Sequence, residues 1–161
     1  MTTQYSLDLL SKSNPVYLSL FVVAICQGHK EHSGRPIEIP SIYLALPICC
    51  SNFFQKSFSN TNIKTGLFSW LNKQPDTIYM IPQSIRNTSK FTNQAIQFSA
   101  HSGMIEFNKS GGVLATSKGH EALKTQSKKS RTTLKRAVNF GAWISEIGDS
   151  RELFSSLGVK A

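Results

Sequence analysis

Acidic side chains are scarce in this chain of 161 residues, which holds nine Asp and Glu against eighteen Lys and Arg. The nine carboxylates are spread thinly, and no pair has a spacing suited to acid–base catalysis or to a two-metal site. His101 and His120 lie outside any Gly-x-Ser-x-Gly or Cys-His setting that would activate a nucleophile. The glycine turns at 110–112 and 117–120 do not fit a Walker motif, so we expect any ATPase to be a separate polypeptide. The sequence therefore predicts a chain that is not an enzyme and carries no cofactor.

Cysteine is also scarce, with three residues in all: Cys26, Cys49 and Cys50. An odd number that includes an adjacent pair does not suit a disulfide framework and favours a reducing cytoplasm. Cys26, His29 and His32 lie within seven residues. Cys-x2-His-x2-His is not a standard zinc spacing, however, and no second pair of ligands follows. We therefore expect no metal site.

Long hydrophobic runs are absent as well. The most apolar run, Val16 to Cys26, reaches about half of a membrane span and ends in polar residues, so it reads as a buried helix. Residues 1–6 lack the basic region and cleavage site of a signal peptide. We expect a cytoplasmic protein without a membrane-spanning segment.

Hydrophobic residues make up 40% of the chain, which is enough for a core. Asn14-Pro15 predicts a helix start, with Asn as N-cap and Pro at the first helical position, and the apolar residues continue to Cys26. Pro47 should kink or end a second helix within 41–54. Further helices are expected at 64–71, 78–101, 134–148 and 151–157. Two short strand-like runs, 103–108 and 112–117, flank a glycine turn. The predicted fold class is mainly α-helical with a small β-hairpin.

A short helix, a longer helix and a hairpin follow one another in the order of a winged helix-turn-helix. The alternative is a plain helical domain with a β-arm. We expect a helical core over residues 1–117, with the winged-helix-like hairpin at 103–117. Residues 118–161 then form the basic segment and C-terminal helices, either in the same domain or as an appended arm.

Positive charge is concentrated in the middle of the chain, where residues 84–136 hold ten Lys and Arg against two Asp and Glu, a net charge of +8. Such a stretch attracts phosphate backbones or an acidic partner surface, although a plain solvated face is the other interpretation. No aromatic residue lies between 118 and 136, which disfavours base stacking on a single strand. The candidate DNA-binding residues are Lys118, Lys124, Lys128, Lys129, Arg131, Lys135 and Arg136.

The C-terminal part of the chain carries more large apolar side chains than a solvated tail would keep. They pack on the chain's own core or form part of a partner interface. The candidate interface residues are Phe140, Trp143, Phe154 and Leu157.

Four segments together resemble the small middle components of three-component ABC systems, bacterial conflict systems that include the Lamassu anti-phage family. They are Asn14-Pro15, Ile42-Tyr-Leu-Ala-Leu-Pro47, Thr65-Gly-Leu-Phe-Ser-Trp-Leu71, and Trp143 to Val159 with Phe154-Ser-Ser-Leu157 inside it. The chain departs from the family in its Pro-Ile-Cys-Cys stretch and its long basic segment.

The resemblance implies a complex with an ATPase of the SMC or Rad50 type, which senses DNA, and with a nuclease-type effector. The chain would be a non-catalytic accessory or bridging subunit of an anti-phage or anti-plasmid defence complex, and would meet DNA within that complex. The alternative is a free-standing winged-helix DNA-binding regulator, favoured by Arg86, Asn87, Asn93 and Gln94 in the expected recognition helix. A third interpretation, a small nuclease or other enzyme, lacks the carboxylates and histidines that it needs.

Overall fold

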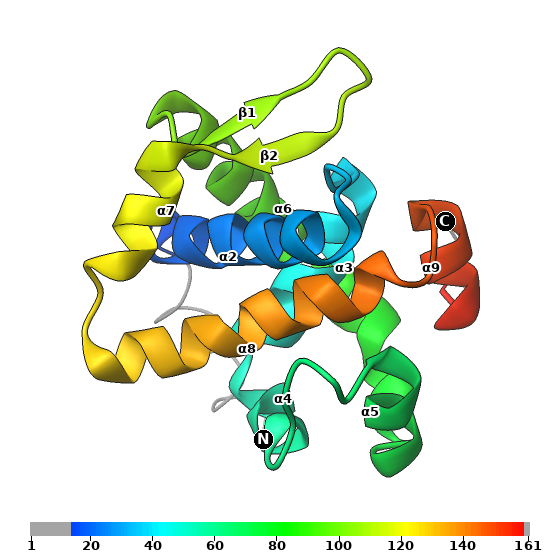
Figure 1. The fold of residues 1–161 in the computed structure, drawn as a ribbon. Coiled ribbons are helices and arrows are strands. Elements are labelled where there is room, and N and C mark those ends of the chain that lie inside the picture. The colour runs from blue at the N-terminus through cyan, green and yellow to red at the C-terminus, as the bar shows by residue number, and fades with distance from the viewer. Residues whose placement is uncertain (1–13, 160–161) are drawn as a thin grey trace.

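The computed structural model describes residues 14–159, in which helices surround one central helix and a two-stranded hairpin lies at one side (Figure 1). The prediction of a mainly α-helical chain with a small β-hairpin is confirmed. The segment tested for a signal peptide, residues 1–6, lies outside the described residues.

The central helix is α2 (Pro15–Ser33). Asn14 is its N-cap, and Asn14 Oδ1 accepts a hydrogen bond from the backbone N–H of Val16 at 2.9 Å. Gly34 ends the helix in the left-handed conformation, with φ 74°. The start agrees with the sequence prediction. The polar residues that follow the apolar run remain helical up to Ser33.

Helix α8 (Lys128–Ser145) makes the most extensive helix contact of α2 among the described elements. Two glycines bring the backbones together. A side chain at Gly28 would overlap the Val138 carbonyl, and one at Gly141 would overlap the Ile25 carbonyl. The two helices therefore cross at a distance that only glycine permits at these positions.

Helix α3 (Ile39–Cys50) contains Pro47 and ends three residues after it, as a proline inside a helix leads one to expect. Ser51 separates α3 from the short helix α4 (Asn52–Gln55), which runs into the 3₁₀ helix η1 (Lys56–Phe58). Helix α5 (Leu67–Lys73) follows after a loop and packs on η1 and α8.

The long helix α6 (Thr77–His101) leads into the hairpin of β1 (Ile105–Phe107) and β2 (Val113–Ala115), which pair antiparallel. Ile37, between α2 and α3, forms an isolated antiparallel bridge with Val113. This order of helices and strands is compatible with a winged helix, which stays a prediction. Helices α7 (Ser117–Lys124) and α8 follow the hairpin.

The C-terminal helix α9 (Ser150–Ser156) is joined to the connection between α2 and α3. The Glu38 carboxylate accepts hydrogen bonds from the backbone N–H and the hydroxyl of Ser150, both at 3.0 Å. Asp149 is the N-cap of α9, and its Oδ1 accepts from the N–H of Glu152 at 2.9 Å. The helix expected at 151–157 is confirmed, one residue earlier at each end.

Four aromatic rings join η1, α5 and α8 in the lower part of the core. Phe58 stacks on Trp70 and on Trp143, with ring centroids 5.6 and 6.0 Å apart. Phe140 lies edge-on to both Phe58 and Trp70. Burial of these large rings holds the 52–73 segment against α8.

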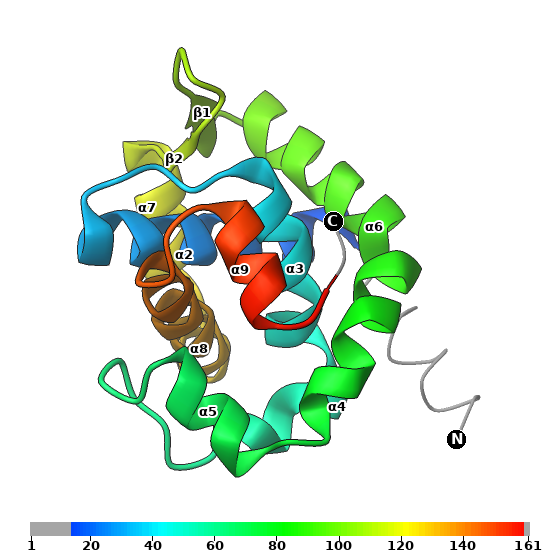
Figure 2. The ribbon, with the colours of Figure 1, turned by 90° about the vertical axis from the view of Figure 1, so that its right-hand side faces the viewer.

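Helices α2 and α3 lie between α6 on one side and α8 on the other (Figure 2). This arrangement gives the molecule two long helical faces that point away from each other. Within the described residues, no helix is both long and apolar enough to cross a membrane.

A candidate anion-binding groove along helix α8

The seven basic residues singled out in the sequence lie on two consecutive helices. Lys118 and Lys124 belong to α7, and the other five belong to the first half of α8. Ser127 begins α8 as its N-cap, with Ser127 Oγ accepting from the N–H of Ser130 at 3.3 Å. All seven are exposed except Arg136, which is half-buried.

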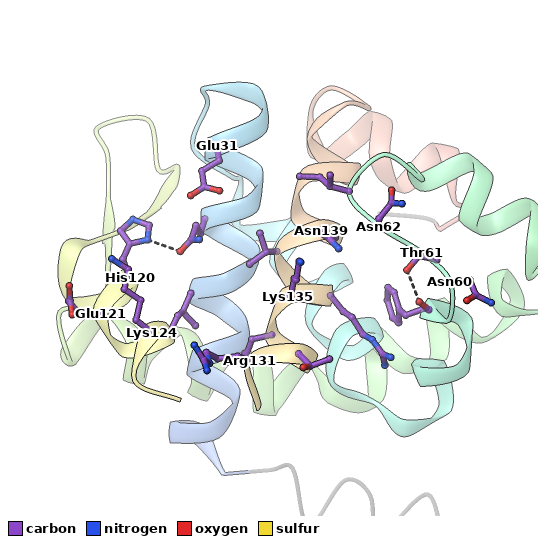
Figure 3. Close-up of a pocket in the computed structure, with 18 of the residues that line it drawn as sticks. Glu31, Asn60, Thr61, Asn62, His120, Glu121, Lys124, Arg131, Lys135 and Asn139 are labelled. Carbon is purple, nitrogen blue, oxygen red and sulfur yellow. Dashed lines mark hydrogen bonds between the residues drawn. The ribbon is translucent and has the colours of Figure 1, made fainter. Parts of the chain in front are cut away.

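An open groove of about 1160 Å³ runs over this part of the surface (Figure 3). Four of the seven basic residues line it: Lys124, Arg131, Lys135 and Arg136. Lys118, Lys128 and Lys129 do not line it. The structure therefore divides one basic stretch of sequence into a groove set and an outer set.

Side chains of α8 form the floor of the groove. Arg131, Lys135 and Asn139 follow one another at intervals of four residues, so they lie along one helix face. This spacing places two cations and an amide in a row that an extended anionic chain could follow.

One wall comes from α2 and α7. His120 Nδ1 and Gln27 Oε1 are 2.7 Å apart and join the two helices. Glu31 and Glu121 lie on the same wall, so two carboxylates accompany the four cations of the lining. An anion is therefore favoured on the α8 floor and away from this wall.

The other wall is the loop of residues 60–63, which the core holds in place. The Trp143 indole N–H lies 3.1 Å from the Asn62 carbonyl and 3.2 Å from the Ile63 carbonyl, and both accept from it. The Thr61 hydroxyl donates to the Phe58 carbonyl at 2.6 Å. The side chains of Asn60 and Asn62 are left at the surface of the groove.

Arg136 differs from the other groove cations. Its Nη1 donates to Gln55 Oε1 at 2.8 Å, and Gln55 Nε2 donates in turn to the carbonyls of Cys49 and Ser51. Arg136 thus ties α8 to the end of α3. Its guanidinium is already engaged, and we assign it to structure more than to ligand binding.

The groove offers cations and amide side chains but no exposed aromatic ring. Amide and hydroxyl groups add hydrogen bonds to phosphate or carboxylate oxygens. Lys and Arg supply a charge attraction that weakens as salt rises. The arrangement can therefore bind an anionic polymer by its backbone.

The candidate partner-interface residues are mostly internal. Phe140, Trp143 and Leu157 are buried, and Phe154 is half-buried against the core. Of the two alternatives for this apolar set, packing on the chain's own core describes the three buried residues. In this structure they present no accessible surface to a partner.

The cysteines and histidines outside the groove have structural environments. Burial raises the pKa of the Cys26 thiol to about 12, and burial also raises the pKa of Cys49. His29 Nδ1 is 3.0 Å from the Arg35 carbonyl, and burial lowers the pKa of His29. His32 pairs with Glu146 at 2.8 Å. Within residues 14–159, no three His, Cys, Asp or Glu residues are grouped so as to hold a metal ion.

Sequence reasoning missed the two walls of the groove. Gln27, His120 and the loop 60–63 are distant in sequence and meet only because α8 crosses α2 at two glycines. The charge run identified the floor, since charge is visible in sequence. No local pattern marks the walls.

A family model described as "ABC-three component (ABC-3C) system Middle Component 3" matches residues 6–161. Neither the curated proteins nor the solved structures contain a match to the chain.

Proposed function

The chain belongs to the Middle Component 3 family of ABC-three component systems. From this premise we propose that it is a non-catalytic bridging subunit, and that it contacts DNA through the groove along helices α7 and α8 (the α7–α8 groove). As a middle component it is an accessory part of a system with further components. The proposal goes further in its partners, an SMC-like ATPase and a nuclease-type effector, and in its setting, a Lamassu-type anti-phage or anti-plasmid defence complex.

The observation that carries the DNA contact is the gathering of Lys124, Arg131 and Lys135 in one open groove. Lys128 and Lys129 are exposed in the first turn of α8 and add positive charge next to the groove lining. Contacts of this kind hold a phosphate backbone without reading its sequence. Binding should therefore be independent of sequence and sensitive to salt.

A non-catalytic role is supported by how the reactive groups are used. The Cys26 thiol is buried with a raised pKa, so it resists conversion to the nucleophilic thiolate. The side chains of His32 and His120 are each engaged with another side chain, Glu146 and Gln27. We propose that the chain positions other components and leaves the chemistry to them.

The first experiment is a pull-down of the tagged chain expressed with its neighbouring genes, followed by size-exclusion chromatography and mass spectrometry. Recovery of a stoichiometric SMC-like ATPase is the expected result. A chain that elutes alone and shifts duplex DNA would overturn the bridging role in favour of a free-standing winged-helix regulator. One observation favours this second candidate. The backbone at Ile37 pairs with Val113 of β2 in an isolated antiparallel bridge, so a third segment lies beside the hairpin, as in a winged helix.

The DNA contact is tested with the variant Lys124→Glu/Arg131→Glu/Lys135→Glu in the groove. A matched control, Lys56→Glu/Lys73→Glu/Arg151→Glu, makes the same change of net charge at exposed positions outside the groove lining. Loss of three phosphate contacts should reduce the slope of log K against log salt by about 2 to 3. We expect the groove variant to lose defence while the complex stays assembled. Equal losses in both variants, or unchanged defence in the groove variant, would refute the contact.

A further inference from the structure

The outer face of α6 is the longest exposed polar surface on a single helix of the described chain. The helix has 25 residues and contains no Asp or Glu. Its exposed residues between 83 and 97 recur at helical spacing and form one stripe. They are Gln83, Arg86, Asn87, Ser89, Lys90, Asn93 and Gln97.

The residues that pack α6 on the core are different from those of the stripe. Ile81, Ala95 and Ile96 are buried against the core. The buried hydroxyls of Thr92 and Ser99 donate to carbonyls four residues earlier in the helix, at 3.2 and 2.7 Å. Packing therefore fixes one face of α6 and constrains the other face less, where Asn93 Oδ1 accepts from the Tyr43 hydroxyl at 3.4 Å.

The composition of the outer face fits nucleic acid better than protein. Asn and Gln side chains pair with adenine edges, and Arg and Lys pair with guanine edges, in the major groove. A stable protein interface instead needs aromatic or apolar anchors. None of the exposed residues from Gln83 to Gln97 is apolar, and the exposed Tyr79 lies one turn before this stripe on the same helix.

The dimensions and the neighbouring hairpin also fit a duplex. The stripe from Gln83 to Gln97 is about 21 Å long at about 1.5 Å per residue, and the major groove admits an α-helix. The β1–β2 turn beyond the end of α6 is held by Asn108, whose Oδ1 accepts from the N–H of Ser110 and of Gly112 at 3.0 and 2.7 Å. Lys109 is exposed at this turn. It could contact a phosphate beside the helix.

Helices α6 and α8 lie on opposite sides of α2 and α3 (Figure 2), and the groove is lined from α8, α7 and α2 and not from α6. One straight duplex cannot touch both. We infer that the outer face of α6 reads base edges in the major groove of a DNA duplex, so that the chain holds two duplex segments, one on each side. The claim that the chain holds two duplex segments rests on the DNA contact proposed for the groove. The claim that α6 binds a duplex does not depend on that contact.

The test uses the full chain and two readouts. Fluorescence anisotropy measures affinity for a random-sequence duplex and for the sequence enriched by rounds of selection from a duplex library. A capture assay measures how much labelled duplex the chain retains on beads that carry a second duplex. Circular dichroism and thermal unfolding confirm that each variant is folded.

Two variants change α6, and a third is their control. Arg86→Glu/Lys90→Glu reverses its exposed charges, and Gln83→Ala/Asn87→Ala removes amides at constant charge. Lys56→Glu/Lys73→Glu is the charge-matched control. We expect the first variant to lose capture by about tenfold or more, because it removes two cationic contacts. The second should lose preference for the selected sequence and keep its affinity for random duplex. The control should behave as the unchanged chain.

The groove variant Lys124→Glu/Arg131→Glu/Lys135→Glu separates the two proposals. Loss of capture with retained sequence preference supports both surfaces. Binding equal to that of the unchanged chain, with loss only in the α6 variants, would refute the groove and uphold α6. Unchanged capture and preference in both α6 variants, or no duplex binding by the unchanged chain, would overturn the α6 inference.

Discussion

The indole N–H of Trp143 donates to the main-chain carbonyl of Asn62, 3.1 Å away and 81 residues earlier in the chain. One buried side chain of α8 therefore holds a wall of the groove. Trp143 serves the core through its ring and the groove through its N–H, and these two roles can be separated.

Trp143→Phe keeps an aromatic ring in the core but removes the donor. We expect a loss of about 1–2 kcal/mol in the free energy of unfolding, since two carbonyls lose their partner. Urea denaturation measures it. Trp70→Phe is the matched control, because Trp70 Nε1 is buried without a hydrogen-bond partner among the described residues. Its removal should cost less. Equal costs would show that the ring, and not the hydrogen bond, matters at position 143.

Gly28→Ala should be among the most destabilising small substitutions in the chain. The added methyl group would overlap the Val138 carbonyl and force α2 and α8 apart. We expect a loss of about 3 kcal/mol, measured by urea unfolding. Gly34→Ala is the comparison, since a side chain there meets open space and only the left-handed backbone, φ 74°, costs about 1 kcal/mol. A smaller loss at position 28 than at position 34 would contradict the close helix crossing.

Arg136 and Arg131 should respond differently to loss of charge. Arg131→Gln should lower the affinity for DNA, because its side chain is exposed on the groove floor. It should also reduce the slope of log K against log salt by the amount that about one phosphate contact contributes. Arg136→Gln should instead lower stability, since it breaks the hydrogen bond to Gln55. Anisotropy titrations at several salt concentrations, with urea unfolding of both variants, separate the two effects. A larger fall in salt slope for Arg136→Gln would reverse the assignment.

Stability should fall as the pH drops below about 6.5, the ordinary pKa of histidine. Burial lowers the pKa of His29 in the folded chain. At a pH between the folded and the unfolded pKa of His29, the imidazole is therefore protonated in the unfolded chain and neutral in the folded chain. Protonation then favours unfolding. Urea unfolding at pH 7.5 and 5.5 tests this, and His29→Gln should reduce the difference. An equal difference in the variant would assign the pH dependence to other groups.

The fold was predictable where a local signal exists. Asn14-Pro15 marks the start of α2, Pro47 marks the early end of α3, and the glycine turn marks the hairpin, because each depends on the conformational limits of a few neighbouring residues. The helical state of residues 118–133 was missed. Its Ser, Thr and Lys residues carry a weak apolar pattern, and the helices are held by contacts with α2 that the sequence does not display.

The candidate site was predictable in charge but not in shape. A run of Lys and Arg shows where cations are dense. Which of them share a groove depends on how α8 crosses α2, and that crossing depends on Gly28 and Gly141, which read in the sequence as ordinary small residues. The engagement of Arg136 by Gln55 is equally non-local.

The apolar surface of α2 is covered largely by α8, which follows it by about one hundred residues in the sequence. At a synthesis rate of about 5–20 residues per second, the ribosome needs several seconds or more to deliver α8 after α2 has emerged. During that interval α3 and α6 can pack on α2, but the face of α2 that α8 covers stays exposed. Newly made molecules should therefore depend on chaperones that shield apolar segments, and expression at reduced temperature with added chaperones should raise the folded yield.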